Sequence, residues 1–183
     1  AAHPISQADV DAGVIANTQR AKDMGYDAVL LAVPFYTKPT QAEIVRHFNA
    51  VIDATDMNIV LYSYPGKDGV EIEYEALDAL ADNPRIIGIK ESSGVLQRAI
   101  GISQRYAGRI QLVSGSDDIA WDFMHWGADS WICGPANCGP STETWPRSSP
   151  RSPPAPPPPA RGGSRSWMTC SRASSRSPTG SAK

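Results

Sequence analysis

Residues 85–94 read RIIGIKESSG, a short apolar run that ends on Lys90 and is followed by a polar segment. Lysine is rarely fully buried, because an ammonium ion removed from water must be paired or must lose its proton. Lys90 is therefore either a solvated residue at the exit of a strand or an amine with a chemical role. In both cases we expect residues 85–90 to form a strand whose residues 86–89 are all apolar, the type found in parallel sheets covered on both faces.

Similar segments recur along residues 1–140 at a spacing of about 25 residues, which is typical of βα repeats. We expect five strands, at residues 26–36, 57–65, 85–90, 109–115 and 130–137. We expect five helices, at residues 8–25, 40–55, 73–83, 95–108 and 117–128. Thr40 and Glu43 have the spacing of a capping box at the start of the second helix. The alternation predicts an α/β fold with a parallel sheet.

Two α/β architectures fit this alternation, a doubly wound open sheet and a (β/α)8 barrel. No GxGxxG or Walker loop follows any expected strand, so nothing favours nucleotide binding. Polar residues gather instead where the strands end, at Tyr36, Tyr62, Tyr64, Lys90, Ser114 to Asp118 and Asn137. Barrel enzymes carry their catalytic groups at that end, but a barrel needs eight strands and only five are expected here.

The overall composition of the 183 residues, 41% hydrophobic and 20% charged, is that of a globular protein. No apolar run reaches the roughly 20 residues of a membrane span, and no signal segment opens the chain. We therefore expect a cytoplasmic protein without membrane contact. Cys133, Cys138 and Cys170 lack metal-ligand or redox spacing, so we expect no metal site and interpret the first two as small buried hydrophobes.

The last 43 residues, 141–183, differ from the α/β domain predicted at residues 1–140. They hold six Arg, one Lys and one Glu, a net charge of +6, and contain no Leu, Ile, Val, Phe or Tyr. Such a segment cannot bury enough apolar surface to fold, so we expect a disordered Pro/Arg/Ser-rich tail. A basic binding tail, an inert linker and a shifted reading frame all fit, and the abrupt change after GPANCGP favours the frame shift. We expect no nucleic-acid binding, because the tail has no RNA-binding signature beyond its charge.

The residues around Lys90 indicate what its amine could do. Strand alternation places Gly88 and Ile86 on the face of Lys90, and Ile87 and Ile89 on the other. Gly88 would leave room beneath the lysine, and desolvation would lower the pKa of its amine. A neutral lysine can attack a carbonyl and form a Schiff base. Spacing alone still favours the alternative, a solvated lysine at a strand exit.

Three consecutive strands end in Tyr36, Tyr62 and Lys90. Adjacent parallel strands lie about 4.8 Å apart, so Tyr62 and Lys90 are expected to face one site. A phenol beside an amine can carry protons to and from a carbinolamine. Each tyrosine alone also fits a core position at which its hydroxyl finds a hydrogen-bond partner. The three residues together, at equivalent ends of consecutive strands, indicate one common site.

Five motifs carry a resemblance that covers roughly residues 1–140: PFYTKPTQAEIVRHF, YSYPG, GIKESSG, SGSDD and GPAN. In this order they resemble the dihydrodipicolinate synthase and N-acetylneuraminate lyase family of class I lyases. The resemblance implies an incomplete (β/α)8 TIM barrel with about strands 4–8 present. It implies that Lys90 forms an imine with pyruvate or a related 2-oxo acid, without a cofactor, and that Tyr62 transfers protons.

Further roles follow only from the resemblance. Tyr36 matches a tyrosine that completes a proton relay across a subunit interface, and Ile132 matches a residue that lines the keto-acid pocket through its backbone. Lys67 stands where lysine-pathway synthases usually carry an Arg that holds the second substrate's carboxylate. Lysine keeps the charge but not the bidentate fork. The parent protein is expected to be a homo-tetramer.

The sequence also departs from the family pattern. The Gly-Thr-Thr-Gly-Glu loop that binds the keto-acid carboxylate is absent, and the tail replaces the C-terminal helices. We expect little activity from this chain alone. The alternatives are a related aldolase, dehydratase or deaminase acting on a sugar acid or a hydroxyproline-derived substrate, a noncatalytic ligand-binding relative, and a nucleic-acid binder that uses the basic tail.

Overall fold

The computed structural model describes residues 7–35 and 37–134. Its elements are α1 (Gln7–Asp23), β1 (Ala28–Ala32), α2 (Gln41–Thr55), β2 (Asn58–Ser63), α3 (Pro65–Asp68), α4 (Tyr74–Leu80), β3 (Ile86–Glu91), α5 (Leu96–Arg105), β4 (Gln111–Ser114), α6 (Ala120–His125) and β5 (Ser130–Trp131). The predicted alternation of strands and helices is confirmed over these residues. The predicted tail at residues 141–183 lies outside the described part of the chain.

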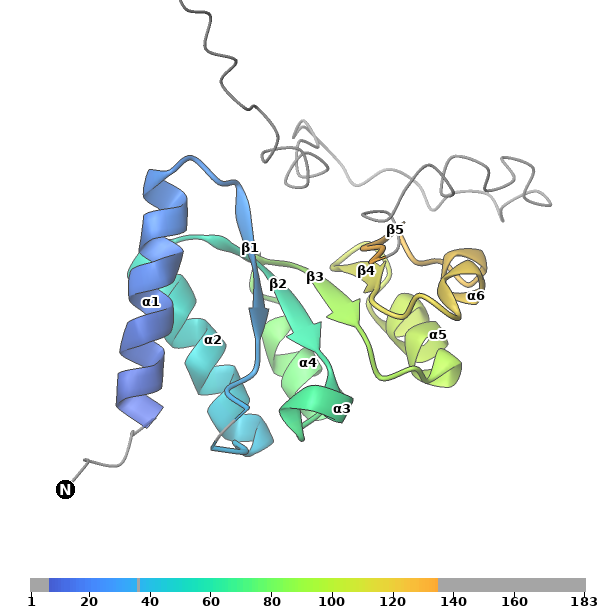
Figure 1. Ribbon diagram of the computed structural model, residues 1–183, viewed down its shortest axis with the longest axis horizontal. Helices are drawn as coiled ribbons and strands as arrows, with labels where there is room; N and C mark the ends of the chain where they lie inside the picture. Colours follow the sequence, from blue (N-terminus) through green and yellow to red (C-terminus); the bar gives the residue numbers. More distant parts are fainter. Residues whose placement is uncertain (1–6, 36, 135–183) are drawn as a thin grey trace, which may run out of the picture.

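The five described strands form one parallel sheet in the order β1-β2-β3-β4-β5. Every strand pairs with the next one along the chain, and right-handed crossovers then place the intervening helices on one face. Figure 1 shows α2 and α4 behind β1 and β2. A doubly wound sheet would reverse its strand order at a switch point. The order is instead that of consecutive strands in a (β/α)8 barrel, of which the described residues form a five-stranded arc.

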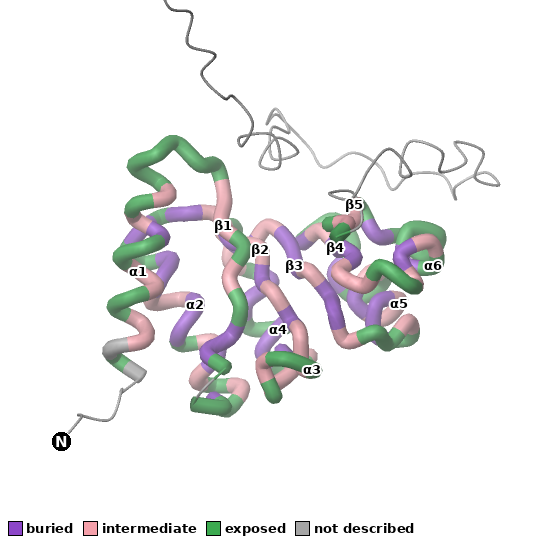
Figure 2. The backbone as a smooth tube through the Cα atoms, in the orientation of Figure 1, coloured by how far each residue is buried: buried purple, intermediate pink, exposed green. Residues whose placement is uncertain are grey.

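The core lies between the helices and the face of the sheet that they cover, which we call the helix-side face. Figure 2 shows buried positions along the strands and on the helices that pack against them. The fully buried side chains of this core include Ile44, Phe48, Ile59, Leu61, Leu77, Leu80, Ile89 and Phe123. Their burial supplies the apolar contact that holds helices and sheet together. No helix among the described residues is long and apolar enough to cross a membrane.

The opposite face of the sheet, the inner face, carries two rows of residues in register. One row is Leu30, Val60, Gly88 and Gln111, and the next is Ala32, Tyr62, Lys90 and Val113. No described helix covers this face, and Leu30 is 42% exposed. The inner face is therefore open at Leu30, whereas Val113 at its other end is only 2% exposed.

The start of β3 differs from the predicted alternation. Ile59 pairs with Ile86, whereas Val60 pairs with Gly88, so the register shifts by one residue between them. Ile86 accordingly joins the core cluster with Ile89. Ile87 is the inserted residue and has no register partner on β2. Placing Ile86 on the face of Lys90 was wrong, because an inserted residue reverses the period of two on which that assignment rested. The placement of Gly88 with Lys90 is unaffected.

The ends of α2 follow from local chemistry. The backbone N–H of Glu43 donates to Oγ1 of Thr40 at 3.4 Å, and the backbone N–H of Thr40 donates to Oε2 of Glu43 at 2.9 Å. The predicted capping box is thus confirmed. The helix ends at Thr55 and is capped by Asp56, whose φ of 51° is left-handed.

Other element boundaries differ from the predictions. The strand predicted at residues 26–36 is paired only over Ala28–Ala32, and the helix predicted at 73–83 covers Tyr74–Leu80. A short helix, α3, was not predicted. It begins at Pro65, whose fixed φ suits the first helical position, and ends before Gly69 with a φ of 69°. This helix places Lys67 beside the end of β2.

Candidate functional site

Lys90 and Tyr62 lie side by side near the carboxyl ends of β3 and β2. They are register partners, and the Nζ atom of Lys90 lies 4.2 Å from the centroid of the Tyr62 ring. This distance is within the range of a cation–π contact. Both residues are half-buried. The structure thus brings together the two residues on which the predicted chemistry depends.

Two glycines near Lys90 allow neighbouring groups to approach closely, and only the second of them meets Lys90 itself. A Cβ atom at Gly88 would lie 3.0 Å from the backbone oxygen of Gln111. A Cβ atom at Gly115 would lie 2.9 Å from Cε of Lys90 and would overlap Oγ of Ser92. The backbone N–H of Gly115 also donates to the carbonyl of Glu91 at 2.9 Å. Gly115 therefore lets the loop after β4 approach the stem of Lys90 closely.

Sequence reasoning assigned the space beside Lys90 to Gly88, where an added Cβ atom would meet Gln111 and Val60, and it attached no role to Gly115. The available signal was the motif SGSDD at residues 114–118, which places a glycine at the end of the strand expected at residues 109–115. Such a glycine often marks a close approach of another backbone or side chain. The neighbour could not be identified, because it lies on a different strand.

A line of ring and cation contacts leads from Lys90 to Lys67. The rings of Tyr62 and Tyr64 have centroids 6.0 Å apart, and Nζ of Lys67 lies 5.5 Å from the centroid of the Tyr64 ring. Lys67 itself is exposed on α3. The structure therefore places this second cation at the same end of the sheet as Lys90. The predicted relay residue Tyr36 lies outside the described residues.

Asp68, next to Lys67, is an unusual group at this end of the sheet. Burial raises the pKa of its carboxyl, while a hydrogen bond from the Tyr64 backbone and the charge of Lys67 oppose that shift. Its Oδ2 atom is buried and has no hydrogen-bond partner. Lys67 therefore lies beside a partly buried carboxyl group. Sequence reasoning did not single out Asp68.

Ile132 lies just beyond β5, where the structure fixes its backbone. Its N–H donates to the carbonyl of Ser114 at 3.1 Å. Oδ1 of Asp117 accepts from Nε1 of Trp131 at 3.0 Å and from the N–H of Gly134 at 3.3 Å. Asp117 thus anchors both sides of Ile132. The side chain of Ile132 is 44% exposed.

The remaining predictions concern thiols and metals. Cys133 has a free thiol and is half-buried, and Cys138 lies outside the described residues. Within residues 7–35 and 37–134, no group of three or more His, Cys, Asp or Glu side chains could hold a metal ion. The chemistry that the described arrangement supports is that of an amine held against a phenol.

Comparison with known families gives one extended match. The model of the dihydrodipicolinate synthetase family matches residues 10–144. Two similar curated proteins are both named 4-hydroxy-tetrahydrodipicolinate synthase. The one from Geobacter metallireducens is 40% identical over 125 residues, covering 68% of this chain and 43% of the relative. The one from Pelobacter propionicus is 39% identical over 123 residues, covering 67% of this chain and 42% of the relative.

Comparison with solved structures agrees. The chloride-inhibited dihydrodipicolinate synthase from Acinetobacter baumannii, complexed with pyruvate, has a TM-score of 0.68 and 37% identity. That match covers 69% of this chain and 44% of the other. YagE from Escherichia coli K12, a prophage protein also in complex with pyruvate, has a TM-score of 0.66 and 25% identity and covers the same shares. The chain thus spans less than half the length of the relatives it matches.

Proposed function

Because the chain belongs to the dihydrodipicolinate synthetase family, we propose that the whole protein is a lyase that forms a Schiff base between Lys90 and pyruvate or a related 2-oxo acid. The observation that carries the proposal is the position of Nζ of Lys90, 4.2 Å from the ring centroid of Tyr62 on the neighbouring strand. The pyruvate found in the Acinetobacter baumannii and YagE structures supports the choice of substrate class.

The proposed reaction starts with the neutral amine of Lys90. Its nitrogen attacks the keto carbon of pyruvate, and the resulting carbinolamine loses water to leave an imine. Tyr62 donates the proton that leaves with the hydroxyl as water and accepts a proton when the imine is later hydrolysed. The imine withdraws electrons from the methyl carbon, which loses a proton and can then form a bond to an aldehyde carbon. Hydrolysis returns the free amine.

The first candidate reaction is that of 4-hydroxy-tetrahydrodipicolinate synthase, in lysine biosynthesis, because the similar curated proteins carry that name. The second candidate is a related aldolase, dehydratase or deaminase acting on a sugar acid or a hydroxyproline-derived substrate. Lys67 favours this second candidate, because its ammonium group offers a point charge and Asp68 lies beside it. A guanidinium fork would bind a carboxylate through two parallel hydrogen bonds.

The remaining roles are part of the same proposal. Ile132 would line the keto-acid pocket through its backbone, Tyr36 would serve the proton relay, and Lys67 would bind the second substrate. The whole protein would act in the cytoplasm as a homo-tetramer, with no metal or organic cofactor. The 183-residue chain alone would turn over little substrate, because the inner face of its described sheet is open at Leu30.

Reductive trapping on the 183-residue chain tests the role of Lys90. The protein is incubated with pyruvate, reduced with borohydride and analysed by peptide mass spectrometry. We expect one reduced pyruvate per chain, on Lys90, and no adduct in Lys90→Arg. Lys67→Arg is the matched control, because it removes an exposed amine at the same end of the sheet, and it should keep the adduct.

Two results would contradict the proposal. Pyruvate binding without an adduct on Lys90 would indicate a noncatalytic ligand-binding relative. An adduct that survives in Lys90→Arg would assign the chemistry to another amine. Substantial condensation activity of the 183-residue chain would contradict the separate proposal that this chain alone turns over little substrate.

A further inference from the structure

The residues that follow Tyr62 and Lys90 face the opposite side of the sheet. Ser63 and Glu91 are register partners on β2 and β3, and both are fully buried, with 0% exposure. A buried carboxylate is unfavourable unless it is paired and hydrogen-bonded. The surroundings of Glu91 therefore determine whether the end of β3 is stable in this position.

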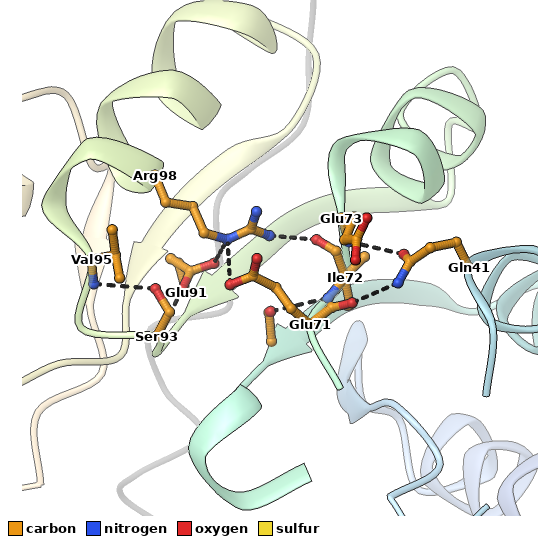
Figure 3. A network of polar contacts seen from close by, with 9 residues as sticks. Gln41, Glu71, Ile72, Glu73, Glu91, Ser93, Val95 and Arg98 are labelled. Atoms are coloured by element: carbon orange, nitrogen blue, oxygen red, sulfur yellow. Dashed lines mark hydrogen bonds and ion pairs between the residues drawn. The ribbon is translucent and has the colours of Figure 1, made fainter. Parts of the chain in front are cut away.

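Two donors satisfy Glu91 (Figure 3). Nε of Arg98 on α5 donates to its Oε2 at 2.8 Å, and the backbone N–H of Ser93 donates to its Oε1 at 2.6 Å. Arg98 is itself only 8% exposed. Both charges are thus buried together, and the residue next to Lys90 is fixed to the helix that follows β3.

The same arginine also reaches the end of β2. Nη2 of Arg98 donates to the carbonyl of Ile72, and the N–H of Ile72 donates to Oγ of Ser63 at 3.4 Å. In addition, the N–H of Ser92 donates to the carbonyl of Ser63 at 2.9 Å. Arg98 consequently connects the helix-side ends of the two strands whose inner-face ends carry Tyr62 and Lys90.

The segment that carries Ile72 is held from a third side. The side chain of Gln41, at the start of α2, donates to the carbonyl of Glu71 at 2.9 Å and accepts from the N–H of Glu73 at 2.9 Å. The carboxylate of Glu71 lies 3.4 Å from Nε of Arg98. Arg98 therefore binds to a segment that is itself anchored, as Figure 3 shows.

We propose that Glu91 and Arg98 are positioning residues that fix the distance between Lys90 and Tyr62 through the sheet. This inference rests on the proposed function, since it concerns the same amine. A contribution to stability alone is a poor explanation for the pair, because a buried ion pair can often be replaced by apolar side chains without loss of stability. A fixed pairing of β2 and β3 is what the geometry of the pair provides.

The double variant Glu91→Leu/Arg98→Met tests this role, because it removes both charges and keeps apolar volume. We expect the variant to stay folded, with an unfolding midpoint close to that of the wild type. We expect pyruvate–borohydride trapping at Lys90 to slow by about tenfold or more, as misplaced reacting groups do. Arg98→Lys keeps the positive charge but loses the planar guanidinium group. Its rate of trapping at Lys90 should lie between those of the wild type and the double variant. Arg109→Met is the control, because Arg109 follows α5 and forms an exposed ion pair with Asp82.

A second measurement does not depend on the reaction. The ring of Tyr62 should shift the Hε protons of Lys90 upfield in the NMR spectrum of the wild type, and this shift should diminish in the double variant. Unchanged trapping and an unchanged shift in a folded double variant would overturn the positioning role. Loss of the fold would overturn it too, since the pair would then serve stability. If the wild type forms no adduct but the shift behaves as expected, the proposed function fails and the positioning role stands.

Discussion

The two faces of the sheet differ most where β2 and β3 end. On the inner face, Tyr62 and Lys90 are half-buried and in contact with each other. On the helix-side face, Ser63 and Glu91 are fully buried and linked through Arg98. In our proposal, adjacent residues of one strand have different roles: those on the inner face react with substrate, and those on the helix-side face hold the strand ends in register. Substitutions on the two faces should therefore have separable effects.

The largest effect is expected from breaking the helix-side network on one side only. Arg98→Met leaves the carboxylate of Glu91 buried without its counter-charge, which should lower the free energy of unfolding by about 3–5 kcal/mol. Denaturant unfolding followed by circular dichroism measures this. The variant that also carries Glu91→Leu should recover most of the loss. If Arg98→Met were as stable as the wild type, the carboxylate of Glu91 would not depend on Arg98 as its buried counter-charge.

A matched pair of leucines compares the apolar parts of the two faces. Leu61→Ala, at a site with 0% exposure, should lower the free energy of unfolding by about 3 kcal/mol. Leu30→Ala, at a site with 42% exposure on the inner face, should lower it by about 0.5 kcal/mol. Urea unfolding of both variants makes the comparison. Equal losses would mean that something covers the inner face in solution.

A smaller effect is expected where the loop after β4 approaches Lys90. Gly115→Ala places a Cβ atom 2.9 Å from Cε of Lys90, which should lower the free energy of unfolding by about 1–3 kcal/mol and slow trapping at Lys90. Gly13→Ala is the control, since a Cβ atom there meets nothing within 4 Å on α1. It should stabilise the protein by about 1 kcal/mol. An unaffected trapping rate in Gly115→Ala would contradict the described approach.

The smallest effect concerns the capping box of α2, which belongs to neither face. Thr40→Ala should lower the free energy of unfolding by about 1 kcal/mol and leave trapping at Lys90 unchanged. Hydrogen bonds from Thr40 lower the pKa of Glu43, so its stabilising contribution is complete above the unfolded pKa and is lost as the pH falls through the folded pKa. Thermal unfolding of Glu43→Gln should therefore approach that of the wild type in acid. A constant difference at all pH values would argue against the cap.

The sequence allowed the local and periodic parts of this structure to be predicted. Apolar runs located the five strands, the Thr40–Glu43 spacing located a helix start, and consecutive strand ends located Tyr62 beside Lys90. Each of these signals needs only neighbouring residues or regular repetition. The family resemblance decided between an open sheet and a barrel.

Other features depend on contacts between distant residues and could not be read from the sequence. The register shift at Ile86 is set by pairing with β2, and the closeness of Gly115 to Lys90 by pairing with β4. An arginine in a helix, such as Arg98, is expected on the surface. Only the folded chain shows that Arg98 is buried against Glu91. A periodic pattern cannot identify which partner a buried charge will find.

The most direct test of the central claim compares two amines in one sample. After pyruvate and borohydride treatment of the 183-residue chain, peptide mass spectrometry measures the fraction of Lys90 and of Lys67 that carries reduced pyruvate. The account predicts that the adduct is concentrated on Lys90, although Lys67 is the more exposed of the two. Equal labelling, or more on Lys67, would mean that exposure alone governs reactivity and would contradict the account.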